Sequence, residues 1–214
     1  MFAVRSVEVQ GAPPEVAAQV RSALRSVEGR SLLAVGAGEI VPRVENLPAV
    51  QAATYDRDFP HTLRVRVVPE VPVAVLRSGP ASWLISSRAR VISTVGSGTL
   101  RGVPRIWLPT GFDAQAGAFL TGDAAAAARA LRAFVNARFA NGVTWARIKQ
   151  GELTLGTRSG LELRLGAPAD LPLKIAIVKS ISPTLTRPSA GGPTYLDVSV
   201  PERPVAGTNS QAAG

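Results

Sequence analysis

The sequence contains no cysteine and a single histidine, His61. Without cysteine the chain can form no disulfide, thiolate metal site or cysteine nucleophile. One histidine cannot build a zinc site of the usual kind, and the position of His61 between two expected strands favours a solvent-exposed turn residue. The serine-lysine and Gly-x-Ser-x-Gly patterns of known nucleophiles are also missing. We therefore expect no enzymatic activity, no metal and no cofactor.

Long apolar runs are equally scarce. Outside the C-terminal tail, the longest stretch without a charged residue is ten residues, as in 91–100. A membrane-spanning helix needs about twenty apolar residues, so we expect none in this sequence. The first eleven residues carry charges and read as a strand, which argues against a cleavable signal peptide. Hydrophobic residues nevertheless make up 46% of the chain, enough to bury a core.

Charge is distributed unevenly along the chain. Residues 1–70 contain eight basic and eight acidic residues, whereas residues 71–214 contain sixteen and seven, so the second part carries the whole net charge of +9. A positive field attracts nucleic acid, anionic lipid or acidic wall polymers. Aromatic residues are only 5% of the sequence, and the basic residues occur singly, as Arg88 and Arg90 do. This pattern favours solvated outer faces of strands over a binding surface for anionic polymers.

The first seventy residues predict a β-α-α-β-β unit. Residues 3–9 alternate as a strand, and a helix follows Pro14 and ends before Gly29. A second helix is expected from about Glu39 to Asn46. Two strands, at 50–55 and 62–68, enclose a turn at Phe59-Pro60.

The remaining chain predicts a strand-rich unit with two helices. Helices are expected from Asp123 to Phe139 and from Asp170 to Ile181, with both aspartates as caps. We expect Trp83, Trp107 and Trp145 to be core or interface anchors, because apolar strand residues flank each of them. The expected strands lie at 73–77, 82–87, 89–94, 103–108, 143–149, 152–157, 161–165 and 195–200.

Several short segments in this order resemble one family of bacterial proteins. They are the Leu-Pro-x-Val turn at 47–50, the Thr-Leu-x-Val-x-Val strand at 62–67 with its preceding proline, the Pro-Val-Ala at 72–74 and the Tyr-Leu-Asp-Val strand at 195–198. Together, over about residues 2–206, they resemble the extracytoplasmic part of the cell-division protein FtsQ/DivIB.

The resemblance implies an α+β chain with a POTRA domain at 1–70, a mixed and mostly antiparallel β-domain at 71–206, and a disordered tail at 207–214. It also implies a single membrane helix ahead of the POTRA domain and a position outside the cytoplasm. The family is not enzymatic. It acts as a divisome scaffold that binds the bitopic proteins FtsB/DivIC and FtsL and helps to regulate septal wall synthesis, and no nucleic-acid partner is expected.

In this family the partner adds a strand to the edge formed by the last β-strand. The resemblance therefore implies a partner-binding site at the C-terminus. Its expected residues are Tyr195, Leu196, Asp197, Val198, Ser199, Val200, Pro201 and Arg203. Two alternatives remain open: a POTRA-containing transport or assembly factor that binds unfolded chains, and a basic module that binds anionic polymers.

Overall fold

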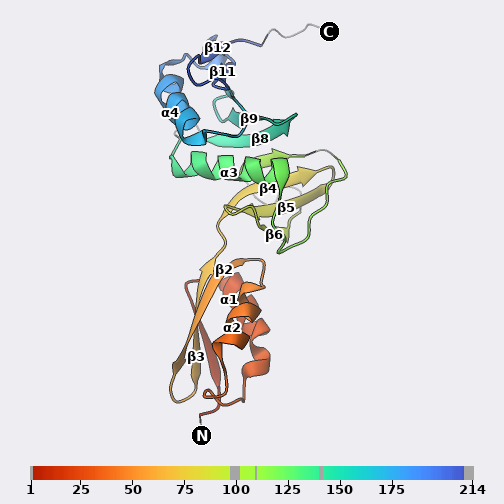
Figure 1. The fold of residues 1–214 in the computed structure, drawn as a ribbon, viewed down its shortest axis with the longest axis vertical. Helices are drawn as coiled ribbons and strands as arrows, with labels where there is room; N and C mark the ends of the chain where they lie inside the picture. The colour runs from red at the N-terminus through yellow and green to blue at the C-terminus, as the bar shows by residue number, and fades with distance from the viewer. Residues whose placement is uncertain (1, 97–101, 109, 140–141, 210–214) are drawn as a thin grey trace. The chain divides into compact units, whose positions relative to one another are not determined.

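The computed structural model describes residues 2–96, 102–108, 110–139 and 142–209 of the chain. It divides into two compact units (Figure 1): Met1–Val71 with the short segment Gln115–Ala118, and Pro72–Ala114 with Phe119–Gly214. The fold is α+β, as predicted from the sequence. No helix in the described ranges is long and apolar enough to span a membrane.

The first unit is a three-stranded sheet covered by two helices. Its elements are β1 (Ser6–Gln10), α1 (Pro14–Ala23), the 3₁₀ turn η1 (Arg25–Val27), α2 (Ala37–Glu45), β2 (Val50–Asp58) and β3 (Thr62–Pro69). β3 lies in the centre, parallel to β1 and antiparallel to β2. The order β-α-α-β-β is the one that the sequence predicts, with helix ends shifted by a few residues.

A separate apolar core holds this unit together. Leu24 from the end of α1, Ile40 and Val44 from α2, and Leu63 and Val65 from β3 are all fully buried. Alternate residues of β3, Arg64 and Arg66, face away from this core. The apolar sides of α1 and α2 thus pack on one face of the sheet. This agrees with the helical spacing of apolar residues in the helices and their alternation in the strands.

Arg64 organises the outer face of the same sheet. It donates to Glu8 at 3.1 Å and to Asp58 at 2.7 Å. Hydrogen bonds from Gln10 and Arg64 lower the pKa of Glu8 below its ordinary value. Because these groups are exposed, their pairing orders the surface and adds little to stability.

His61 lies in the turn between β2 and β3, as expected, but it is only half exposed. Its Nδ1 lies 3.0 Å from the carbonyl oxygen of Ala3. The neighbouring backbone amide of Arg5 donates to the carbonyl of His61. The residue therefore ties the N-terminal segment to the turn instead of projecting freely into solvent.

The second unit is built on a nine-stranded mixed sheet in the order β12-β11-β10-β9-β8-β7-β4-β5-β6. Its helices are α3 (Gly122–Asn136) and α4 (Leu171–Ile181), with 3₁₀ turns η2 (Ser182–Thr184) and η3 (Pro188–Ala190). Its strands are β4 (Pro72–Ser78), β5 (Ala81–Ser86), β6 (Val91–Thr94), β7 (Arg105–Trp107), β8 (Val143–Lys149), β9 (Glu152–Thr157), β10 (Glu162–Gly166), β11 (Tyr195–Asp197) and β12 (Val205–Gly207).

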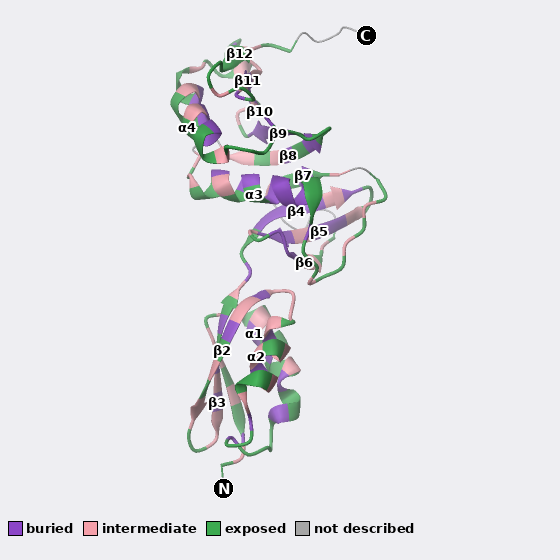
Figure 2. Ribbon diagram, viewed as in Figure 1, coloured by how far each residue is buried: buried purple, intermediate pink, exposed green. Residues whose placement is uncertain are grey.

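One face of this sheet is covered by α3 and α4. α3 contacts β4, β7 and β8 through a run of buried alanines that ends at Leu131 and Phe134. Small side chains let this helix approach the strands closely. Lys174 of α4 is buried and donates to the carbonyls of Leu165 and Ala167 at 2.7 and 2.8 Å, which satisfies its ammonium group. Figure 2 shows buried residues along α3, β4 and β5.

Of the two expected aspartate caps, Asp123 is wrong and Asp170 takes the cap position without a capping hydrogen bond. The residue that precedes α3 is Thr121, and Asp123 lies within the first turn. Asp170 does precede α4, but in a left-handed conformation with φ 52°, and its side chain makes no cap hydrogen bond. An aspartate near a helix start favours that end electrostatically even when it does not cap it.

The C-terminal boundary also differs from the sequence prediction. Gly207, expected to begin a disordered tail, ends strand β12. The backbone N–H of Asn209 donates to Thr194 Oγ1 at 2.8 Å, and its side-chain Oδ1 accepts from Arg164 at 2.5 Å. Order continues past residue 206 because these two contacts fix the chain. Residues 210–214 lie outside the described residues.

The separate core of the first unit generates a stability prediction. We expect a fragment of residues 1–72 to unfold cooperatively in urea. In that fragment, Leu24→Ala should lower the free energy of unfolding by about 2–5 kcal/mol, because it leaves a cavity. Leu33→Ala is the control: Leu33 is 62% exposed, so the change should stay within about 0.5 kcal/mol. A non-cooperative urea curve for the unmutated fragment would count against an independent domain.

Candidate strand-addition site

The C-terminal strands form one end of the nine-stranded sheet. β11 lies between β10, to which it is parallel, and β12, to which it is antiparallel. β12 pairs with β11 alone among the described strands. The prediction that Tyr195–Val200 is the last strand and the sheet edge is therefore wrong. The edge is β12, a three-residue strand that the sequence analysis missed.

The segment expected to continue the strand beyond Asp197 turns instead. Val198 is fully buried and donates its amide to the carbonyl of Arg164 at 2.8 Å. The Ser199 amide then donates to Asp197 Oδ1, and the Arg203 amide donates to the Val200 carbonyl. Pro201 lies inside this turn. The chain folds back here, so residues 198–204 connect β11 to β12.

The hydrogen-bond direction along β11 follows from its bonds to β10. Glu162 donates to the Thr194 carbonyl and Val198 donates to the Arg164 carbonyl. Because backbone groups alternate in direction along a strand, the N–H and C=O groups of Tyr195 and Asp197 point the other way, toward β12. They face Gly207 and Val205, their register partners.

The same alternation assigns the directions within β12. Val205 and Gly207 direct their backbone groups at β11, and Ala206, between them, directs its N–H and C=O outward. Pro204, which precedes the strand, has no N–H to offer. The outer side of β12 is thus a short row of backbone groups that a further strand can extend.

Two apolar side chains stand beside this edge. Val205 is 53% exposed and Val200, in the preceding turn, is 52% exposed. Arg203, also in the turn, is exposed. Of the eight residues expected to bind a partner, Val200, Pro201 and Arg203 thus lie in the turn next to the edge. Tyr195, Leu196 and Asp197 support β12 from the inside.

The opposite end of the sheet is less open. β6 is the other terminal strand, but the chain just before it is paired: the Leu120 amide donates to the Ala89 carbonyl, and Arg90 forms a bridge with Phe119. In the first unit the terminal strands are β1 and β2. β2 is the longer of the two. If the protein were a factor that binds unfolded chains, the alternative function, β2 would be its binding edge.

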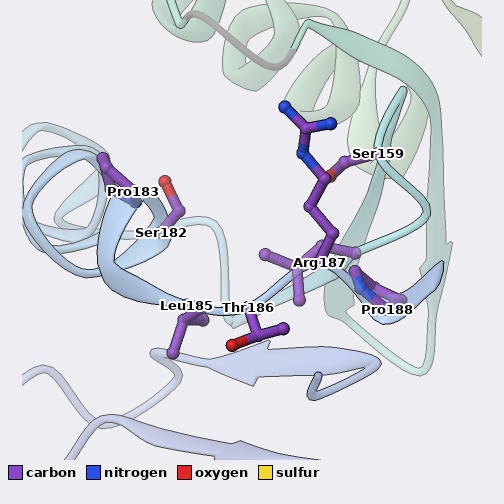
Figure 3. A pocket seen from close by; sticks show the side chains of 8 residues that line it. Ser159, Ser182, Pro183, Leu185, Thr186, Arg187 and Pro188 are labelled. Carbon is purple, nitrogen blue, oxygen red and sulfur yellow. The ribbon is translucent and has the colours of Figure 1, made fainter. Parts of the chain in front are cut away.

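A small pocket lies near the C-terminal end of the second unit (Figure 3), with a volume of about 150 Å³. Ser159, Ser182 and Thr186 contribute hydroxyl groups to it, and Arg187 is its one charged residue. Its lining contains no acid, histidine or second cation that would pair with a serine to activate it. In the described part of the chain no group of three acidic or histidine side chains gathers as a metal site would require.

Comparison with known proteins addresses the first unit. Residues 2–68 match the family model described as POTRA domain, FtsQ-type. The chain carries an FtsQ-type POTRA domain. This match confirms the FtsQ/DivIB resemblance drawn from the sequence and supports a role as a cell-division scaffold. The match covers the POTRA domain and does not extend into the nine-stranded sheet.

Among solved structures, one similar to this chain is the major extracytoplasmic domain of the trans isomer of the bacterial cell division protein DivIB from Geobacillus stearothermophilus. The likeness covers 55% of this chain and 98% of that one, with 11% sequence identity and a TM-score of 0.35. No curated protein matches the sequence.

The position of β11 inside the sheet generates a second prediction. Leu196 is 1% exposed, so Leu196→Ala should lower the free energy of unfolding of the second unit by about 2–5 kcal/mol. Val205→Ala on β12 should change it by no more than about 0.5 kcal/mol. Thermal and urea unfolding of the full chain would compare the two. Equal effects would contradict the assignment of β11 as internal and β12 as the edge.

Proposed function

We propose that this protein is a non-enzymatic scaffold of the cell-division machinery that binds a bitopic division protein by strand addition to β12. The partner is of the FtsB/DivIC kind, in a complex that includes an FtsL-like protein. The scaffold is held at the cell membrane by a single N-terminal helix, with both units outside the cytoplasm. The POTRA match supports this placement. The N–H and C=O groups of Ala206, which point outward from the sheet, are the observation that supports β12 as the binding site.

Strand addition suits the chemistry of this edge. Each backbone group that points outward from β12 is paired only in the complex, so the main chain supplies affinity and the adjacent side chains supply specificity. Val200 and Val205 offer an apolar strip for alternate side chains of the incoming strand. The turn also exposes Glu202 and Arg203, which offer the partner one charge of each sign.

The edge is also protected against copies of itself. β12 spans only three residues, and Pro204 before it interrupts the row of donors. Short edges and prolines limit unwanted pairing between sheets. A partner strand that continues past β12 therefore needs contacts with the turn as well, which makes the turn residues part of the proposed interface.

Paired proline substitutions test the site. Ala206→Pro removes an N–H that points outward, so we expect the melting temperature to stay nearly unchanged while affinity for the partner falls at least tenfold. Val205→Pro removes an N–H that points at Asp197, so we expect the strand to detach and the melting temperature to fall. Binding isotherms with the extracytoplasmic part of the FtsB/DivIC-like protein, together with melting curves, measure both effects.

The outcomes separate the candidate edges. If Ala206→Pro folds and binds the partner normally, β12 is not the binding edge. If the partner then also binds the fragment 1–72, the POTRA edge at β2 is the site. The proposal requires that both variants lose partner binding and that only Ala206→Pro keeps the melting temperature of the unmutated protein.

A further inference from the structure

The face of the nine-stranded sheet opposite α3, called here the open face, collects aromatic and basic side chains from separate strands. One register row runs Arg77, Trp107, Arg147 across β4, β7 and β8. The adjacent row places Arg105 of β7 beside Trp145 of β8. Between these residues along the strands, Leu76, Ile106 and Ala146 are fully buried on the helix side. Neighbours in space on this face are far apart in the sequence.

Two of the aromatic rings lie flat on the sheet because their register partners are glycines. A Cβ atom on Gly156 would lie 2.0 Å from the indole nitrogen of Trp145, so the ring occupies the place of a side chain there. The same device recurs three strands away, where a Cβ on Gly207 would lie 2.6 Å from the hydroxyl oxygen of Tyr195. Trp145 held this way presents its other face outward, whereas the guanidinium of Arg164 stacks on the ring of Tyr195.

Cations surround these rings. The guanidinium of Arg77 lies 5.3 Å from the centre of the Trp107 ring, that of Arg147 lies 5.7 Å from Trp145, and that of Arg164 lies 3.8 Å from Tyr195. Arg105 and Arg147 are exposed and form no ion pair within the described residues. Trp107 is 46% exposed, so its ring is accessible to a ligand.

Acidic groups of this face lie from β9 toward β12. Glu152 of β9 is exposed and is the register partner of Lys149. Glu162 is 4.0 Å from Arg164, and Asp197 accepts from the Ser199 amide. The open face of β4, β7 and β8 carries no acid. A ligand with negative groups is therefore favoured over β4, β7 and β8, where Trp107 and Trp145 lie on neighbouring strands.

We propose that the open face binds an anionic glycan, a chain of sugar rings that carry carboxylate groups. Sugar rings stack through their C–H faces on the electron-rich faces of Trp107 and Trp145, and Arg77, Arg105 and Arg147 pair with the carboxylates. Rings that lie flat suit a stacked ligand better than insertion into a lipid surface. The choice of a glycan over single-stranded nucleic acid rests on the proposed position outside the cytoplasm, since both stack on such platforms.

Four soluble probes test the ligand class by quenching of tryptophan fluorescence at low salt. Oligogalacturonate has rings and carboxylates, maltohexaose has rings alone, and polyglutamate has carboxylates alone. We expect oligogalacturonate to bind at least tenfold more tightly than either of the others. Equal binding of polyglutamate would remove the role of stacking and overturn the proposal. Tighter binding of the fourth probe, oligothymidylate, would overturn it in favour of a nucleic-acid surface.

Charge-matched variants test the location. Arg105→Gln with Arg147→Gln should weaken oligogalacturonate binding at least tenfold, whereas Arg129→Gln with Arg132→Gln on exposed positions of α3 should leave it within about twofold. Equal losses would mean that only the net charge of the protein matters.

Trp107→Ala, at an exposed position, should also weaken oligogalacturonate binding about tenfold with an unchanged melting temperature. Normal binding by this variant would overturn the proposed role of the open face. Ala206→Pro should keep glycan binding, which separates this inference from strand addition.

Discussion

The hydrogen-bonded register of the nine-stranded sheet is the constraint on which the second unit depends. Side chains alternate between two faces along every strand, so the pairing fixes in one step which residues enter the core beneath α3 and which remain on the open face. A shift of one residue in β7 would bury Trp107 and Arg105 and expose Ile106. The core, the residues of the open face and the direction of the backbone N–H and C=O groups of β12 all follow from this single alignment.

The sequence was sufficient where a pattern is local. The spacing of apolar residues predicted both helices of the POTRA domain, and strands β8 and β9 have the predicted bounds. Residues that alternate over five or more positions, such as 62–68, carry enough signal to specify a strand and its inner face. The family resemblance, based on short segments in a fixed order, was confirmed for this domain.

The sequence was not sufficient where pairing partners decide the outcome. β12 has three residues, Val205 to Gly207, after a proline and before a polar tail, so no periodicity marks it. Tyr195–Asp197 looked like a final edge because nothing recognisable follows it. Trp83, Trp107 and Trp145 were all expected to be core or interface anchors because their neighbours along the chain are apolar, but Trp83 is buried and Trp107 is exposed. The exposure of Trp107 and Trp145 depends on the register of their strands with β4, β8 and β9. That register cannot be predicted from the neighbouring residues in the sequence.

The parallel pairing of β10 with β11 has a consequence for the timing of assembly. The two strands are joined by the long crossover that contains α4, so their pairing is a contact of high sequence separation that requires closure of a long loop. β12 has no support until β11 is in place. The proposed binding edge is therefore completed late in folding, and a copy in which β11 has not docked presents no β12 edge.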